Sequence, residues 1–173
     1  MAEPNLLEPN ARLPLRWGAY LDRYVLGIAF IVGGGLGLQG ANPRVLPLLL
    51  AGTIMHAAGW AVLPSPGWRR VIAAALGTAT IWLLLMGPTA VGALALPFAG
   101  WMLVRQRPWR AWVGILFPIA YGIAVPQFVH EYRYQPIALG VGIAVLVGSA
   151  WLARGIARAT DAAIPSEPED DFR

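Results

Sequence analysis

The stretch VIAAALGTATIWLLLMGPTAVGALALPFAGWMLV, residues 71–104, contains thirty-four residues and no charge. As a single helix it would extend about 51 Å at about 1.5 Å per residue, far beyond a hydrocarbon core of about 30 Å. Met86-Gly87-Pro88-Thr89 lies near its middle. Gly-Pro breaks helices because proline lacks an amide donor and disfavours helical geometry in the residue before it. We therefore expect two helices joined by a turn at this point.

Uncharged runs of similar character fill the rest of the chain, at 24–43, 45–68, 111–130 and 134–153. The composition is 57% apolar and 13% charged, whereas soluble proteins average about 25% charged residues. A membrane-spanning helix needs about 20 apolar residues. The sequence thus predicts an all-α, polytopic membrane protein with six transmembrane helices arranged as three hairpins, at residues 22–40, 45–63, 68–86, 89–105, 110–130 and 136–157.

The arginines predict the orientation of these helices, since cytoplasmic loops carry the excess of positive charge. With six spans both termini lie on one side, and the opposite side holds only Arg44 and Arg133. A single pass through 71–104 would divide the arginines almost evenly, whereas a re-entrant hairpin would preserve the asymmetry. We therefore expect a protein of the cell membrane with both termini on the cytoplasmic side. That side holds Arg12, Arg16, Arg23, Arg69, Arg70, Arg105, Arg107, Arg110, Arg154, Arg158 and Arg173.

A repeated phrase, GWAVLPSPGWRR at 59–70 and GWMLVRQRPWRA at 100–111, fits this orientation. Its tryptophans fall at the predicted cytoplasmic helix ends, where an apolar ring with one polar N–H favours the headgroup region. We interpret Trp60, Trp68, Trp101 and Trp109 as interfacial anchors. The repetition is compatible with an ancestral triplication of a hairpin, but any hairpin array with short inner loops places Trp and Arg at such positions.

The two ends of the chain differ from its centre. Residues 1–19 form a predicted cytoplasmic segment without a signal-peptide pattern, 20–160 the transmembrane domain, and 161–173 an acidic, disordered cytoplasmic tail. The chain has no cysteine, which excludes disulfides and thiolate chemistry, and its thirteen basic residues are all arginine, which suggests a GC-rich bacterial genome. These arginines are dispersed along membrane boundaries, so no nucleic-acid binding is expected.

Small residues suggest where helices approach one another closely. Gly33 and Gly37 form a GxxxG pair, and Gly140, Ala144 and Gly148 form a stripe of small residues on the last helix. We expect the first helix to pack on the last, or either one on a second subunit. The GxGxxG match at 35–40 lies at the end of an apolar span rather than between a strand and a helix, so it does not indicate a nucleotide site.

Two places hold candidate functional side chains. His56 is the one ionisable residue predicted near the bilayer midplane, where it could relay protons or bind a metal; the simpler interpretation is a neutral histidine hydrogen-bonded to a neighbouring helix, with Thr78 or Thr80 as partner. A polar cluster at the outer side of helix 110–130 is the other candidate site, with interfacial anchoring as its structural alternative. Its members are Tyr121, Gln127, His130 and Glu131.

The sequence contains no nucleophile, metal-ligand cluster or paired carboxylates, so an enzyme, a metal or a cofactor is not expected. All loops are short, and any activity must lie in the membrane or at its surface. We predict a small accessory or assembly component that contacts the lipid bilayer and a membrane-protein partner or further copies of itself. The alternative is a transporter or channel for a neutral or lipid-like solute, which requires the polar residues of the spans to converge on a path.

Overall fold

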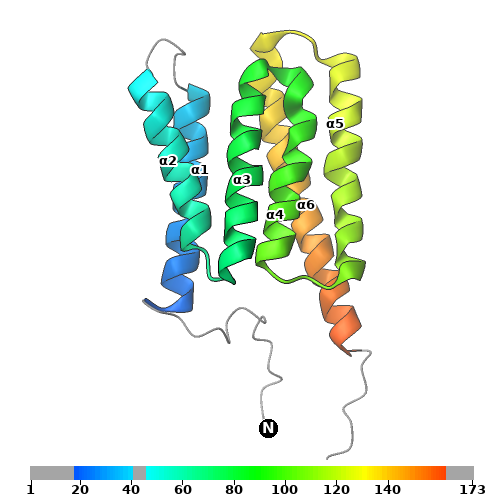
Figure 1. The fold of residues 1–173 in the computed structure, drawn as a ribbon. Coiled ribbons are helices and arrows are strands. Elements are labelled where there is room, and N and C mark those ends of the chain that lie inside the picture. Colours follow the sequence, from blue (N-terminus) through cyan, green and yellow to red (C-terminus); the bar gives the residue numbers. More distant parts are fainter. Residues whose placement is uncertain (1–17, 41–45, 163–173) are drawn as a thin grey trace, which may run out of the picture.

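The computed structural model describes residues 18–40 and 46–162, and every regular element within these ranges is helical (Figure 1). Short 3-10 segments precede or follow several of the α-helices and continue them. The predicted and observed helices agree to within a few residues. The elements are α1 (Tyr20–Gly40), α2 (Leu46–Val62), α3 (Gly67–Leu83) with η2 (Leu84–Met86), η3 (Pro88–Leu94) with α4 (Ala95–Val104), η4 (Trp109–Ile115) with α5 (Leu116–Phe128), and η5 (Tyr132–Tyr134) with α6 (Gln135–Ala162).

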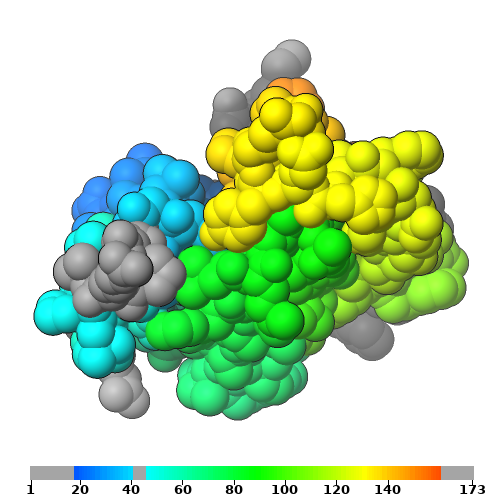
Figure 2. All heavy atoms as spheres, turned by 90° about the horizontal axis from the view of Figure 1, so that it is seen from above, coloured from blue at the N-terminus to red at the C-terminus, as the bar shows by residue number. Residues whose placement is uncertain are grey.

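The helices stand side by side and form three successive hairpins, α1–α2, α3–α4 and α5–α6 (Figure 1). Seen from above, the first hairpin lies at one side and α5 at the other, α3 and α4 lie between them, and the start of α6 lies beside α1 (Figure 2). The start of α1 and the end of α6 lie at the same end of the bundle, which we call the lower end after its place in Figure 1. The turn between η2 and η3 and the turn between α5 and α6 lie at the upper end.

The turn predicted in the middle of residues 71–104 is present. The chain reverses at Gly87, which has φ 102° and ψ −167°, a backbone conformation that is essentially restricted to glycine. Pro88 follows at the first position of η3, where its missing amide hydrogen costs no helical hydrogen bond. The Gly87 amide donates to the Leu84 carbonyl at 3.3 Å, which closes the turn.

The outer surface of the bundle is apolar, as expected of helices surrounded by lipid. Large apolar side chains project outward all along it, among them Ile54, Val71, Ile123 and Ile137. Four helical segments are long and apolar enough to cross a membrane: Tyr20–Gly40, Gly67–Met86, Trp109–Phe128 and Tyr132–Thr160. The apolar segments Leu46–Val62 and Pro88–Val104 are shorter. The described chain is therefore an all-helical protein with four candidate membrane spans.

Glycines join α1 and α2, but they are different glycines from the predicted ones. A Cβ added to Gly34 would meet the backbone of His56 and lie 2.6 Å from the Gly52 carbonyl oxygen. One heptad away, a Cβ on Gly59 would lie 2.7 Å from the Gly27 carbonyl oxygen. Two glycine pairs spaced seven residues apart thus let two antiparallel backbones touch.

The predicted packing glycines lie on other faces. A Cβ on Gly33 would meet only the flexible end of Met55, and Cβ atoms on Gly37, Gly140 and Gly148 would have no neighbour within 4 Å. Within this single chain, these four positions do not bring two backbones together. Contact of Gly37, Gly140, Ala144 and Gly148 with a second subunit stays a prediction. The predictions for residues 1–17, 163–173 and Arg44 lie outside the described residues.

Candidate functional site

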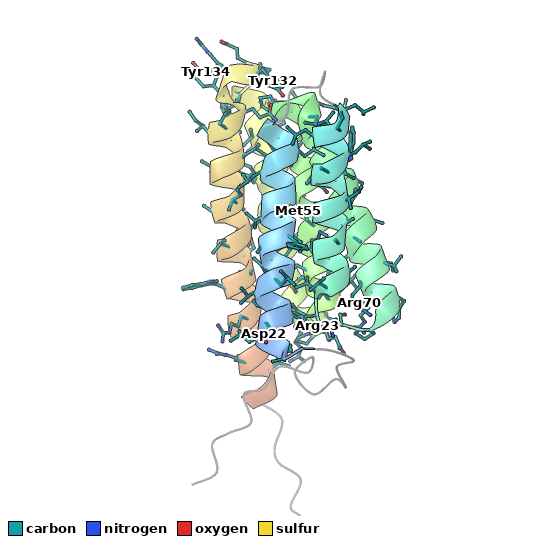
Figure 3. The ribbon with its side chains drawn as sticks, turned by 90° about the vertical axis from the view of Figure 1, so that its left-hand side faces the viewer. Asp22, Arg23, Met55, Arg70, Tyr132 and Tyr134 are labelled. Carbon is teal, nitrogen blue, oxygen red and sulfur yellow. The ribbon has the colours of Figure 1, made fainter. Side chains whose placement is uncertain are left out.

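Arginines at the lower end donate to carbonyls in the last turns of neighbouring helices. Arg23 Nε donates to the carbonyl oxygen of Val62 at 3.1 Å, and an Nη of Arg70 donates to that of Ala61 at 2.9 Å, both at the end of α2. At the end of α4, an Nη of Arg69 donates to the carbonyl oxygen of Leu103 at 3.1 Å. Figure 3 shows Arg23 and Arg70 at this end of the bundle. Because the last carbonyls of a helix lack intrahelical donors and carry partial negative charge, guanidinium groups stabilise them well.

The two copies of the repeated phrase present one tryptophan each in the same way. Trp68 and Trp109 are 58% and 79% exposed, and in each case the guanidinium of the following arginine lies over the ring. Their role as interfacial anchors stays a prediction. Trp101 is half-buried against Tyr24, with the Arg105 guanidinium 5.2 Å from its ring centroid.

Trp60 differs from the predicted anchor because it is only 3% exposed. Its ring packs in a cluster with Leu63, Ala73 and Val104, so it lies inside the bundle rather than at a lipid-facing interface. The close approach of α3 requires a residue without a side chain at position 77, since a Cβ there would collide with the indole of Trp60. The indole N–H of Trp60 points into the bundle, where it donates a hydrogen bond to a neighbouring side chain.

That acceptor is His56, which is 4% exposed and fully engaged by the chain itself. Trp60 Nε1 donates to His56 Nε2 at 3.1 Å, and His56 Nδ1 lies 2.8 Å from the carbonyl oxygen of Ile31 on α1. Because Nε2 accepts, the hydrogen belongs on Nδ1, which then donates to Ile31. This geometry describes a neutral histidine that ties α2 to α1. The suggested partners Thr78 and Thr80 are not used, since Thr80 donates to backbone carbonyls and no partner of Thr78 is found.

The side chains of the predicted outer cluster do not converge. Tyr121 donates to the carbonyl of Ala138 and so joins α5 to α6. Gln127 and His130 are exposed, and Glu131 forms an exposed ion pair with Arg133 at 2.7 Å. Tyr132 and Tyr134 lie at the upper extremity of the bundle (Figure 3). The four predicted side chains therefore share no common pocket among the described residues, and interfacial anchoring stays a prediction.

Two glutamines at the upper end form the network that the sequence analysis missed. Gln39 Nε2 donates to the Ile81 carbonyl oxygen at 2.9 Å, near the end of α3. Gln135 Nε2 donates to the Leu84 carbonyl oxygen at 2.6 Å and to Gln39 Oε1 at 3.3 Å. Gln135 is 5% exposed, and its Oε1 is buried without a hydrogen-bond partner. The network connects α1, α3 and α6, which are remote in sequence.

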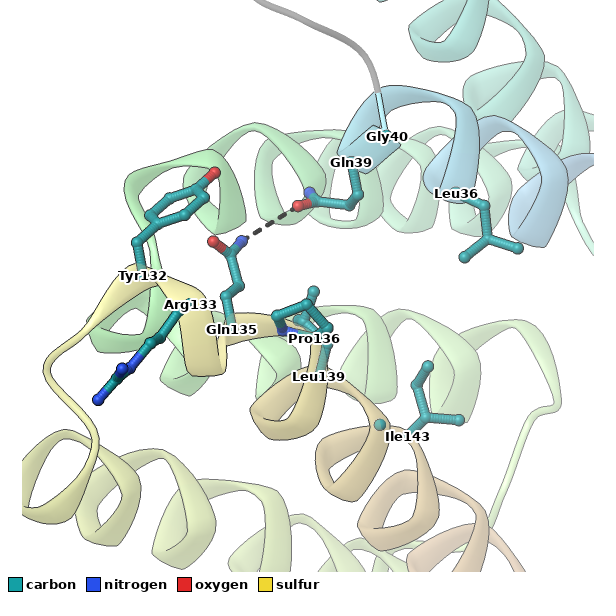
Figure 4. A pocket seen from close by; sticks show the side chains of 10 residues that line it. Leu36, Gln39, Gly40, Tyr132, Arg133, Gln135, Pro136, Leu139 and Ile143 are labelled. Atoms are coloured by element: carbon teal, nitrogen blue, oxygen red, sulfur yellow. Dashed lines mark hydrogen bonds between the residues drawn. The ribbon is translucent and has the colours of Figure 1, made fainter.

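A groove of about 590 Å³ opens beside this network, between the upper halves of α1 and α6 (Figure 4). The two amides lie at its head, and the carbon side chains of Leu36, Leu139 and Ile143 line its length. Its volume falls in the range of small-molecule sites. We call this feature the α1–α6 groove; it is also lined by Gly40, Tyr132, Arg133, Pro136 and Gly140.

The sequence offered a weak signal for this network. Gln39 and Gln135 stand at opposite ends of uncharged runs, on the same predicted side of the membrane, as neutral polar residues that an apolar helix would otherwise exclude. Among the described residues, no group of three or more His, Asp or Glu side chains is placed to hold a metal ion. Comparison of the chain with protein-family models, curated proteins and solved structures gives no match.

Proposed function

We propose that this chain crosses a cell membrane six times, with the lower end of the bundle on the cytoplasmic side. The two shorter segments, 46–62 and 88–104, have 17 residues each and extend about 25 Å at about 1.5 Å per residue, at the lower limit for a span. They stand beside the longer helices over much of the same height (Figure 1). The arginines that donate to helix ends gather at the lower end, in agreement with the orientation that the positive-inside rule predicts.

Single-cysteine labelling tests this topology cleanly because the chain has no cysteine of its own. Cysteines introduced at 42, 89 and 134 should react with a membrane-impermeant maleimide added outside intact cells; positions 89 and 134 are exposed at the upper end of the bundle. Cysteines at 67, 107 and 165 should react only after the membrane is opened. Protection of position 89 together with normal reaction at 42 and 134 would contradict full spanning by α3 and α4 and indicate a re-entrant hairpin.

Within this topology we propose a non-catalytic role, as an accessory or assembly component of a membrane complex. The observation that carries it is that several interior polar side chains bond to groups of the chain itself. His56, Thr80 and Tyr121 each bond to backbone carbonyls on neighbouring helices, and Thr53 bonds to Leu49 and Trp82. Among the described residues, these four side chains bond to separate partners rather than to one another, whereas a channel for a polar solute would require polar side chains along one path. Because these interior side chains hold helices together and are not available to a solute, we infer that the protein acts through its outer surface.

Affinity purification from native membranes in a mild detergent, followed by quantitative mass spectrometry, tests this role. An accessory subunit should bring a membrane-protein partner in a fixed, near-stoichiometric ratio. An unrelated multi-pass protein with the same tag, prepared in parallel, identifies non-specific companions. Recovery of the chain without any enriched protein partner would contradict the proposal.

The second candidate is transport of a lipid-like solute, and the α1–α6 groove favours it, because this cavity opens to the side of the bundle and has an apolar lining with a polar head. Reconstituted vesicles distinguish the two roles. Transport requires movement of a labelled lipid or neutral solute across vesicles that contain the pure protein, at a rate that rises with protein density. An accessory role requires no such movement.

A further inference from the structure

We propose that the α1–α6 groove binds one membrane lipid whose headgroup carries a hydroxyl group. The hydroxyl donates to Oε1 of Gln135, and one acyl chain lies along the apolar lining formed by Leu36, Leu139 and Ile143. The inference rests on the proposed membrane-spanning topology, but it is independent of whether the chain is an accessory subunit or a transporter.

The first support is the fixed orientation of the Gln135 amide. Its Nε2 lies between two acceptors, the Leu84 carbonyl oxygen and Gln39 Oε1, and the latter is itself oriented because Gln39 Nε2 donates to Ile81. A rotated amide would place Oε1 against a carbonyl oxygen. The network therefore leaves Gln135 Oε1 as an acceptor without a donor, and only 5% of this residue is exposed. Buried polar atoms are nearly always paired, so this acceptor indicates a missing donor.

The second support is the distribution of polarity along the groove. Amides lie at the head of the groove, where the bundle ends, and apolar carbon lines the part that extends toward the bilayer centre (Figure 4). Gly140 contributes no side chain, and a Cβ there would have no neighbour within 4 Å, so the groove stays wide at this height. An amphiphile has this same order of polar and apolar parts. A partner helix would instead require contacts along its whole length.

The third support concerns charge at the mouth of the groove. Arg133 lines the groove, but its guanidinium forms an ion pair with Glu131 at 2.7 Å and lies over the Tyr134 ring. The mouth therefore presents little net charge, and an anionic phosphate gains little there. Selection by a neutral hydroxyl at Gln135 agrees with this arrangement better than selection by headgroup charge.

Native mass spectrometry of the purified full chain tests the site with two matched lipids. The protein is equilibrated with equal amounts of phosphatidylglycerol and phosphatidylmethanol of identical acyl chains. Both carry one negative charge, and only phosphatidylglycerol carries hydroxyl groups. The most strongly retained lipid on the wild-type protein should be phosphatidylglycerol, preferred about fivefold, as one neutral hydrogen bond would give.

Three variants locate the effect. Gln135→Leu should remove the preference while a lipid is still retained. Gly140→Leu, which leaves the glutamine network intact, should fill the groove and abolish retention of the tightest lipid. Gly155→Leu is the matched control on the same helix, since position 155 also has open space around it and does not line the groove, and it should behave as wild type.

Equal retention of the two lipids by the wild type would overturn the proposal. So would a preference that persists in both Gln135→Leu and Gly140→Leu, because the selective site would then lie elsewhere. A transmembrane polypeptide released by Gly140→Leu, with no retained lipid in the wild type, would show that a protein occupies the groove. Circular dichroism confirms that each variant is folded, and the labelling experiment detects a failure of the topology separately.

Discussion

Trp60 and His56, one helical turn apart on α2, form a hydrogen bond of 3.1 Å that determines which nitrogen of the histidine carries its hydrogen. With Nε2 accepting from the indole, Nδ1 is the donor to the Ile31 carbonyl on α1. The pair therefore converts a polar residue inside an apolar bundle into a link between two helices. Both partners are needed for it, since a buried donor or acceptor left alone is destabilising.

Replacing Trp60 by phenylalanine should weaken this link. In the wild type, nitrogen-15 NMR of labelled histidine should show His56 neutral and protonated at Nδ1. Trp60→Phe keeps an aromatic ring but removes the indole donor, so it should reduce the free energy of unfolding in detergent by about 1 kcal/mol or more. Trp68→Phe, at an exposed position, should change it little. Protonation of His56 at Nε2 in the wild type would show that this nitrogen does not accept a hydrogen bond from Trp60 and would contradict the prediction.

Substitution of Gly34 by alanine should destabilise the first hairpin. The new Cβ would meet the backbone of His56 and of Gly52, and neither can give way without moving a helix. Overpacking of this kind costs about 1–3 kcal/mol. Gly37→Ala, in the same helix with no neighbour within 4 Å, should be neutral or stabilising. Equal effects of the two substitutions on thermal unfolding would contradict the close α1–α2 packing.

Removal of the Arg23 guanidinium should leave the Val62 carbonyl at the end of α2 without this hydrogen-bond donor and so destabilise the protein. Arg23 is 5% exposed and donates to the last carbonyl of α2. Arg23→Met retains most of the side-chain length but no donor, and it should cost about 1.5–3 kcal/mol, the range for hydrogen bonds from charged groups. Arg154→Met, at an exposed arginine of the same end, is the control and should cost much less. Unfolding titrations in mixed detergent micelles provide the measurement.

Gly87 should tolerate no other residue without strain. Its φ of 102° with ψ −167° costs an L-residue about 1–3 kcal/mol, so Gly87→Ala should lower the unfolding temperature. Gly67→Ala, at an exposed helix start with open space, should not. If Gly87→Ala proved as stable as the wild type, the turn between α3 and α4 would have to adopt a different backbone conformation.

The glycines illustrate how far the sequence could predict the packing. A spacing of four residues, as in Gly33 and Gly37, and a spacing of seven, as in Gly27 and Gly34, both place small residues on one helix face. In helices that are apolar all round, no polar stripe indicates which face turns inward. The matching heptad spacing of Gly52 and Gly59 on the next helix was the available signal, and it becomes decisive only when the two helices are placed antiparallel.

The sequence by itself determined the helices, their hairpin order and the turn at Gly87, because these depend on the length of uncharged runs and on the local geometry of glycine and proline. Only the tertiary structure decided which side chains meet. It buried Trp60 on His56, separated Gln127 and His130 from any site, and joined Gln39 to Gln135 across ninety-six positions of the chain. Such meetings depend on how each helix is rotated about its axis. That rotation is set by packing between whole helices, which a nearly uniform apolar sequence does not reveal.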